Sequence, residues 1–158
     1  MNSKEHLLFD YQDVRHWKKV YQSDISNIIV ELKESLNEPS VVILDGAVGA
    51  GKTTFTNVFL GEDKSGSPTY SLINDCGDVV HADFYRLDSP EEIIHLELAM
   101  YLDEKKYFLV EWGKDYIRDI YRELSDDFNY FQLSIEANDK KDDEESASRN
   151  YFLKKIIF

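Results

Sequence analysis

The chain has 158 residues, of which 42% are apolar and 13% aromatic, and this supply of core residues excludes a globally disordered protein. We expect residues 1–158 to form one domain, because two domains of this total length would each be small for a self-sufficient core. The 31 acidic and 18 basic residues give a formal charge of -13, which disfavours free-standing nucleic-acid binding. The ordinary interpretation of this charge is solubility, and a sharper one is a basic protein partner.

The N-terminal residues contain no apolar core of signal-peptide length, and no apolar run approaches the roughly 20 residues that span a bilayer. A lone cysteine, Cys76, permits no intramolecular disulfide, which is typical of a reducing compartment. Because no activating group is placed beside it, we interpret Cys76 as an inert thiol. We therefore expect a cytoplasmic protein without membrane contact.

The first part of the chain is predicted to run from helix to strand to helix. Residues 10–36 carry helical periodicity, with Ser23 as a cap candidate for the apolar stripe that follows. Residues 41–44 are apolar and mostly β-branched, as expected of a strand that is buried on both faces. After a glycine-rich turn, residues 52–60 predict a short helix, and the Gly, Ser and Pro of residues 61–69 indicate a loop.

The middle of the chain predicts more strands than helices. Residues 70–75 and 78–86 indicate two strands that are joined by a tight turn at Cys76 and its glycine neighbour. Residues 106–112 form another apolar run of the buried type, and residues 114–124 predict a helix.

A further helix is predicted over residues 88–103. Ser89 is a cap candidate, Pro90 suits the first helical position, and Glu92 can complete a capping box.

The end of the chain is rich in strands. Residues 128–137 and 149–158 indicate a C-terminal hairpin, and the acidic loop 138–148 between them is a solvated connection. Since helices alternate with apolar strands before this point, we predict an α/β fold of three layers, like that of P-loop NTPases. Its central sheet should be mostly parallel, with antiparallel strands added at an edge.

The turn after residues 41–44 matches the pattern G-x-x-x-x-G-K-[ST] between a strand and a helix, which is the context of a phosphate-binding loop. Its matching residues are Gly46, Ala47, Val48, Gly49, Ala50, Gly51, Lys52 and Thr53. Glycines let backbone N–H groups approach phosphate oxygens, and the following helix adds free donors. Lys52 is expected to reach the β- and γ-phosphates, and the Thr53 hydroxyl to bind Mg²⁺. A merely tight turn would need neither residue.

A nucleotide site also needs an acid on the metal side, at the end of a neighbouring strand. Asp83 and Glu111 each follow an apolar run and are the candidates. Either one alone could be a helix cap or a solvated edge residue, but together with the loop they indicate a site. The chain lacks the N-K-x-D motif by which GTPases read guanine, so adenine is favoured by default.

Four motifs in order resemble the bacterial TsaE family, also called YjeE. They are GAVGAGKTTF (46–55), SPTYSL (67–72), HADFYRL (81–87) and VEWG (110–113). The resemblance runs from about Val41 to Gly113. The first motif is common to many NTPases, whereas the three later motifs in this order are specific to the family. It implies a small ATPase with ATP and Mg²⁺ as cofactors.

The resemblance also implies roles for residues. Metal contacts would fall on Thr53 and Glu111, and the catalytic set would be Lys52, Asp83 and Glu111. The nucleotide would further contact Thr54, Thr69 near the γ-phosphate, and Trp112. The residues leave open whether Asp83 acts on the attacking water or on the metal shell.

Neighbouring residues have less definite roles. His81, on an apolar strand, is more typical of a satisfied core residue than of a ligand. Arg86 is either a charge for the phosphate or the partner, or a surface ion pair. Trp112 either packs or gates the site.

By the same resemblance, the partners are TsaD and TsaB, which add threonylcarbamoyl to the adenosine beside the anticodon of certain tRNAs. The tRNA would contact this chain only through these partners, in keeping with its acidic charge. Two alternatives stay open: a small-molecule kinase that uses the same loop, and a nucleotide-dependent regulator without useful hydrolysis.

Overall fold

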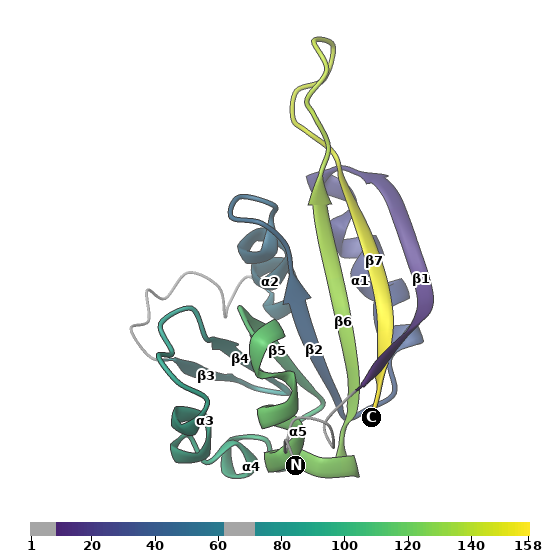
Figure 1. The fold of residues 1–158 in the computed structure, drawn as a ribbon. Helices are drawn as coiled ribbons and strands as arrows, with labels where there is room; N and C mark the ends of the chain where they lie inside the picture. Colours follow the sequence, from purple (N-terminus) through teal and green to yellow (C-terminus); the bar gives the residue numbers. More distant parts are fainter. Residues whose placement is uncertain (1–8, 62–71) are drawn as a thin grey trace.

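The computed structural model describes residues 9–61 and 72–158, which build a seven-stranded sheet in the order β1-β7-β6-β2-β5-β4-β3 (Figure 1). The strands are β1 (Asp10–Val20), β2 (Ser40–Asp45), β3 (Ile73–Cys76), β4 (Val79–Asp83), β5 (Tyr107–Glu111), β6 (Asn129–Ala137) and β7 (Arg149–Ile157). The α-helices are α1 (Ile25–Ser35), α2 (Lys52–Leu60), α3 (Glu91–His95), α4 (Leu98–Tyr101) and α5 (Ile117–Leu124).

The centre of the sheet is parallel. Strand β2 pairs in parallel with both β5 and β6, and β4 pairs in parallel with β5. The antiparallel additions lie at both edges, as β6–β7–β1 on one side and β4–β3 on the other. The predicted α/β class is therefore confirmed, and the prediction of antiparallel strands at one edge is corrected to two.

The two faces of the sheet carry separate hydrophobic cores. Val42 and Leu44 of β2 belong to the core under α1 and α2. Val41 and Ile43 of the same strand belong to the core under α3, α4 and α5. Successive side chains of a strand point to opposite faces, so a strand between two helical layers must be apolar at every position. The predicted three layers follow from this arrangement.

The prediction of a helix over residues 10–36 is wrong for its first half. Residues Asp10–Val20 form the edge strand β1, in which only Trp17 and Val20 are buried. The strand is held by its pairing with β7, a distant part of the chain, and a largely exposed edge strand leaves little local pattern. Ser23 lies in a short 3₁₀ turn, and no side-chain cap begins α1, so the proposed cap is also wrong.

The helix expected over residues 88–103 is broken into α3 and α4. Glu97 takes a positive φ of 54° between them, which no α-helix accommodates. One half of the predicted capping box forms, because the Glu92 carboxylate accepts the backbone N–H of Ser89 at 3.1 Å. The Ser89 side chain makes no cap bond, and Pro90 takes the position before the first helical residue.

The C-terminal hairpin of β6 and β7 is confirmed, and its acidic loop 138–148 projects from one end of the sheet (Figure 1). The helix predicted over residues 52–60 is α2, with the same bounds. The predicted loop 61–69 lies outside the described residues beyond Gly61, as does the start of the strand predicted over residues 70–75. Among the described helices, none is long and apolar enough to cross a membrane.

Candidate nucleotide site

The glycine-rich loop lies between the end of β2 and the start of α2, and its glycines serve different needs. Gly49 and Gly51 have φ values of 83° and 111°, in the left-handed region that side chains disfavour. Gly46 is needed for space, because a Cβ there would come within 2.8 Å of the Ile135 carbonyl oxygen of β6. The loop is thus shaped by its backbone, and Val48 at its tip is 83% exposed.

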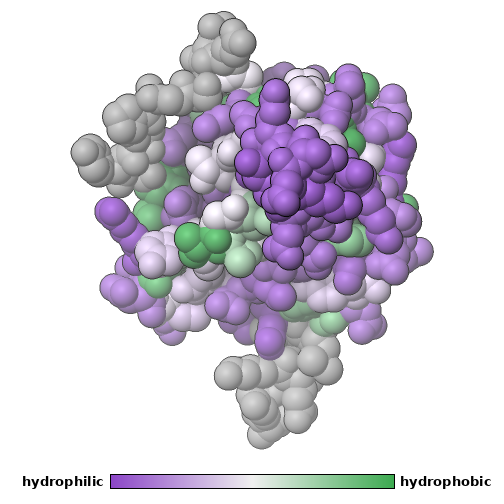
Figure 2. Space-filling view, turned by 90° about the horizontal axis from the view of Figure 1, so that it is seen from above, coloured by the Kyte–Doolittle hydropathy of each residue, from purple (hydrophilic) through white to green (hydrophobic). Residues whose placement is uncertain are grey.

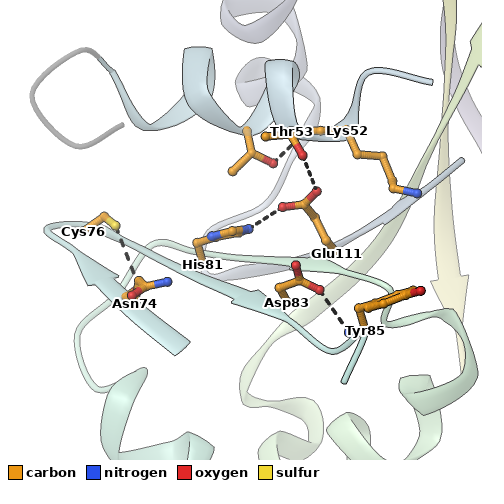
Figure 3. Close-up of polar contacts among 9 residues, drawn as sticks. Lys52, Thr53, Asn74, Cys76, His81, Asp83, Tyr85 and Glu111 are labelled. Atoms are coloured by element: carbon orange, nitrogen blue, oxygen red, sulfur yellow. Dashed lines mark hydrogen bonds and ion pairs between the residues drawn. The ribbon is translucent and has the colours of Figure 1, made fainter. Parts of the chain in front are cut away.

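The Lys52 side chain is buried and folded back along the loop (Figure 3). Its ammonium donates to the carbonyl of Gly46. It also lies 3.9 Å from the centre of the Trp112 ring, within the range of a cation–π interaction. The ammonium therefore stands at the mouth of the loop, where a phosphate oxygen could replace the carbonyl as its acceptor.

Glu111 joins the loop to the neighbouring strands. It ends β5, is 5% exposed, and accepts from the Thr53 hydroxyl at 3.4 Å through Oε1 (Figure 3). Its other oxygen, Oε2, lies 2.7 Å from His81 Nε2. A buried carboxylate needs such partners, because an unpaired charge is costly to remove from water. Thr53 and Glu111 thus present adjacent oxygen atoms at the edge of the loop.

Asp83 lies beside Glu111 as its register partner on β4. Its side chain is exposed, and Oδ1 accepts the backbone N–H of Tyr85 at 3.0 Å. This bond orients the exposed carboxylate. Asp83 therefore reaches the site as a second, exposed acid next to the buried one.

Two aromatic side chains cover this side of the loop. The rings of Tyr85 and Trp112 lie 5.1 Å apart, and both residues are exposed. Trp112 has a positive φ of 59°, which is unusual for a bulky residue. Trp112 therefore forms part of the site surface and not of the core, and its contact with Lys52 couples it to the loop.

The structure brings together most of the residues that the sequence predicts. The loop residues 46–54, Asp83, Glu111 and Trp112 meet at the carboxyl ends of β2, β4 and β5. Thr54 is half-buried in the first turn of α2, Arg86 is exposed, and Thr69 lies outside the described residues.

The sequence interpretation missed the role of His81, which it assigned to the core. His81 is half-buried and does have a partner, but that partner is Glu111. The signal was available, since residues two apart on a strand point to the same face and His81 stands two before Asp83.

Magnesium fits the pair formed by Thr53 and Glu111. Mg²⁺ prefers oxygen ligands and is usually held by one or two protein side chains together with waters and phosphates. Within residues 9–61 and 72–158, no group of three His, Cys, Asp or Glu side chains is placed to hold a metal by itself. The donor set therefore suits a metal that arrives with a phosphate ligand.

A cavity of about 440 Å³ lies on the other side of the loop. It is lined by residues 45–50 and by residues 134–137 at the end of β6. Seen from this end of the molecule, the surface is mostly hydrophilic, and a paler area lies beside the strongly hydrophilic side chains (Figure 2). The loop thus has the Thr53–Glu111 pair on its β5 side and a cavity on its β6 side.

The chain is similar to curated TsaE proteins over about half its length or slightly more. The tRNA threonylcarbamoyladenosine biosynthesis protein TsaE of Nostoc sp. is 34% identical over 107 residues, which are 60% of this chain and 65% of the relative. The protein of the same name from Haemophilus influenzae is 37% identical over 91 residues, or 52% and 58% of the two chains. The Bacillus subtilis protein is 35% identical over 106 residues, or 61% and 65%. The chain thus matches less than two thirds of each of these relatives.

A solved structure and a family model extend the comparison. The crystal structure of Bacillus subtilis YdiB superposes with a TM-score of 0.53 and 22% identity, covering 95% of this chain and 87% of that one, which supports the same fold. The family model "Threonylcarbamoyl adenosine biosynthesis protein TsaE" matches residues 21–148. Because this match covers most of the chain, the chain belongs to the TsaE family of tRNA threonylcarbamoyladenosine biosynthesis.

Proposed function

We propose that the chain is a Mg²⁺-dependent ATPase that supports threonylcarbamoyl modification of tRNA by binding the TsaD–TsaB pair. The observation that carries this proposal is the 3.4 Å approach of the Thr53 hydroxyl to the Glu111 carboxylate at the edge of the loop. A loop that merely connected a strand to a helix would not need a buried acid beside its hydroxyl.

The chain's own residues divide the work of binding. Backbone N–H groups of the loop and the N-terminus of α2 bind phosphate oxygens. Lys52 exchanges the Gly46 carbonyl for a phosphate oxygen, so its charge is already in place before the nucleotide arrives. Thr53 and Glu111 would hold Mg²⁺, which neutralises charge on the β- and γ-phosphates when it is bound.

The neighbouring acids and His81 have separate tasks in this proposal. His81 holds one oxygen of Glu111 at 2.7 Å and so fixes the direction of the other. The exposed Asp83 carboxylate orients the attacking water, since the Tyr85 N–H holds its Oδ1 and so directs its other oxygen. The partners hold the tRNA, so the charge of -13 on this chain does not oppose the function.

The test is phosphate release from Mg-ATP without an added acceptor, with and without the TsaD–TsaB pair. The proposal expects release that the partners increase, and nucleotide-dependent capture of the partners in a pull-down with ATP, ADP or no nucleotide. A small-molecule kinase would transfer its phosphate only to an acceptor, so absence of release under all conditions would contradict the ATPase.

Variants separate hydrolysis from binding. Glu111→Gln and Asp83→Asn are each expected to lower hydrolysis by about 10²- to 10⁴-fold. Asp83→Asn should keep most of the ATP affinity. Asp78→Asn is the matched control, because Asp78 is an exposed acid just before the opposite end of β4. Unchanged support of tRNA modification by both site variants would favour a regulator without hydrolysis instead.

A further inference from the structure

Arg149, the first residue of β7, lies directly against the phosphate loop. A Cβ built on Gly51 would meet Arg149 Nε at 2.5 Å and its Cδ and Cζ at 2.8 Å. The side chain of Arg149 therefore occupies the space that any side chain at position 51 would need. Gly51 is thus required for its positive φ and also to admit a guanidinium beside the loop.

One nitrogen of this guanidinium, Nε, stands without an acceptor in the described part of the chain. Arg149 Nε is buried without a hydrogen-bond partner among the residues that the structure describes. Within those same residues, no acidic side chain forms an ion pair with it. A buried donor without an acceptor is unfavourable, so we expect a further acceptor to bind there.

The backbone around Arg149 is held in place on both sides. The Asn138 N–H donates to the Ser148 carbonyl at 2.9 Å, and the Asn138 side chain donates to Asn150 Oδ1 at 3.1 Å. Asn150 also accepts the backbone N–H of Lys19 on β1 at 2.9 Å. These bonds close the base of the acidic loop 138–148 and fix the strand position from which Arg149 reaches the phosphate loop.

Arg149 stands on the side of the loop opposite to Glu111. In the sheet order, β5 with Glu111 lies on one side of β2, and β6 and β7 lie on the other. If Thr53 and Glu111 face the γ-phosphate and its metal, the phosphate chain must leave the loop towards β6 and β7. The cavity formed by residues 45–50 and 134–137 lies on that side as well.

We propose that Arg149 binds the α-phosphate of the nucleotide and so sets the affinity of the site for nucleoside phosphates. This inference rests on the proposed nucleotide site and names a residue for its nucleoside end. The planar guanidinium directs its N–H donors at one phosphate in a fixed geometry, which a lysine cannot reproduce.

The experiment is calorimetric titration of the full chain with Mg-ATP and with ADP, in the wild type and in three variants. Arg149→Ala removes the guanidinium, and Arg149→Lys keeps the charge but lacks the Nε–H. Arg15→Ala is the control, because it removes one exposed positive charge from the edge strand β1. Thermal unfolding of each variant checks that it is folded.

The proposal expects Arg149→Ala to lower the affinities for ATP and for ADP by the same factor, roughly 10- to 100-fold, because both nucleotides carry the α-phosphate. Arg149→Lys should remain several-fold weaker than the wild type, and Arg15→Ala should change neither affinity. Equal affinities in the wild type and Arg149→Ala would overturn the proposal, as would a loss confined to ATP, which would place Arg149 at the γ-phosphate. If the folded wild type bound neither nucleotide, that result would contradict the proposed function itself, and not only the role of Arg149.

Discussion

Two tyrosines offer a test of how this protein satisfies its buried hydroxyl groups. The Tyr151 side chain is 0% exposed, packs on Phe55 of α2, and its hydroxyl has no hydrogen-bond partner among the described residues. The Tyr107 hydroxyl donates to Glu38 at 2.9 Å. Replacing each tyrosine by phenylalanine removes a hydroxyl group, which at Tyr151 lacks a partner within the described residues and at Tyr107 donates a hydrogen bond.

The two changes should have opposite signs. Burying a hydroxyl without a partner is unfavourable by about 1–3 kcal/mol, so Tyr151→Phe should stabilise the protein by about 1 kcal/mol or more. Tyr107→Phe loses a bond to a charged acceptor and should destabilise by about 1.5–3 kcal/mol. For a domain of this size, each kcal/mol corresponds to roughly 2–4 °C in the unfolding midpoint.

The pH dependence adds a second readout. Burial raises the pKa of Tyr151, and burial together with the Glu38 bond raises the pKa of Tyr107 to about 12. A raised folded-state pKa contributes stability that is present below the unfolded value near 10 and is lost as the pH rises through the folded value. The alkaline loss of stability should therefore be smaller in each variant than in the wild type.

The assay is thermal unfolding of the wild type, Tyr151→Phe and Tyr107→Phe at pH 7 and pH 10.5. At pH 7 the midpoint should rise for the first variant and fall for the second. If Tyr151→Phe lowered the midpoint as much as Tyr107→Phe, the Tyr151 hydroxyl would have an acceptor after all. The reasoning from an unpartnered hydroxyl would then be refuted, and Arg149 Nε would need to be reconsidered with it.

Three further changes test the loop, a half-buried acid and the aromatic cover. Gly46→Ala should destabilise the protein by about 1–3 kcal/mol and weaken ATP binding, because the added Cβ would come within 2.8 Å of the β6 backbone. Thermal unfolding measures the first effect and calorimetric titration the second. Burial raises the pKa of Asp119, because it disfavours the ionised carboxylate in the folded state. Asp119→Asn should therefore raise the unfolding midpoint at pH 7. The difference in midpoint from the wild type should disappear near pH 3, where the wild-type carboxyl is protonated in both states. In a Trp17→Phe background, the fluorescence of Trp112 should change when Mg-ATP draws the Lys52 ammonium from its ring, and unchanged emission on saturation would count against that contact.

The local parts of the site were predictable from the sequence. The phosphate loop and the following helix are built from adjacent residues, so the motif specifies both β2 and α2 closely. Glu111 and Asp83 were predictable because each stands at the end of an apolar run, and parallel strands bring such ends to one edge of the sheet.

The distant parts could not be predicted in this way. Strand β1 is stabilised by pairing with the last strand, so its own residues carried a misleading helical period. The break between α3 and α4 depends on one residue, Glu97, in a left-handed conformation that its neighbours do not signal. Arg149 meets Gly51 only through the hairpin geometry, and no spacing in the sequence relates them.

The strand that carries the loop has its alternate residues in the two cores, Val42 and Leu44 in one and Val41 and Ile43 in the other. Neither helical layer can therefore separate from the sheet without exposing one side of β2. Amide hydrogens of β2 should accordingly exchange with solvent only when the whole chain unfolds, while those of the short helices α3 and α4 exchange through smaller openings. The base of the phosphate loop would thus remain rigid while α3 and α4 open locally.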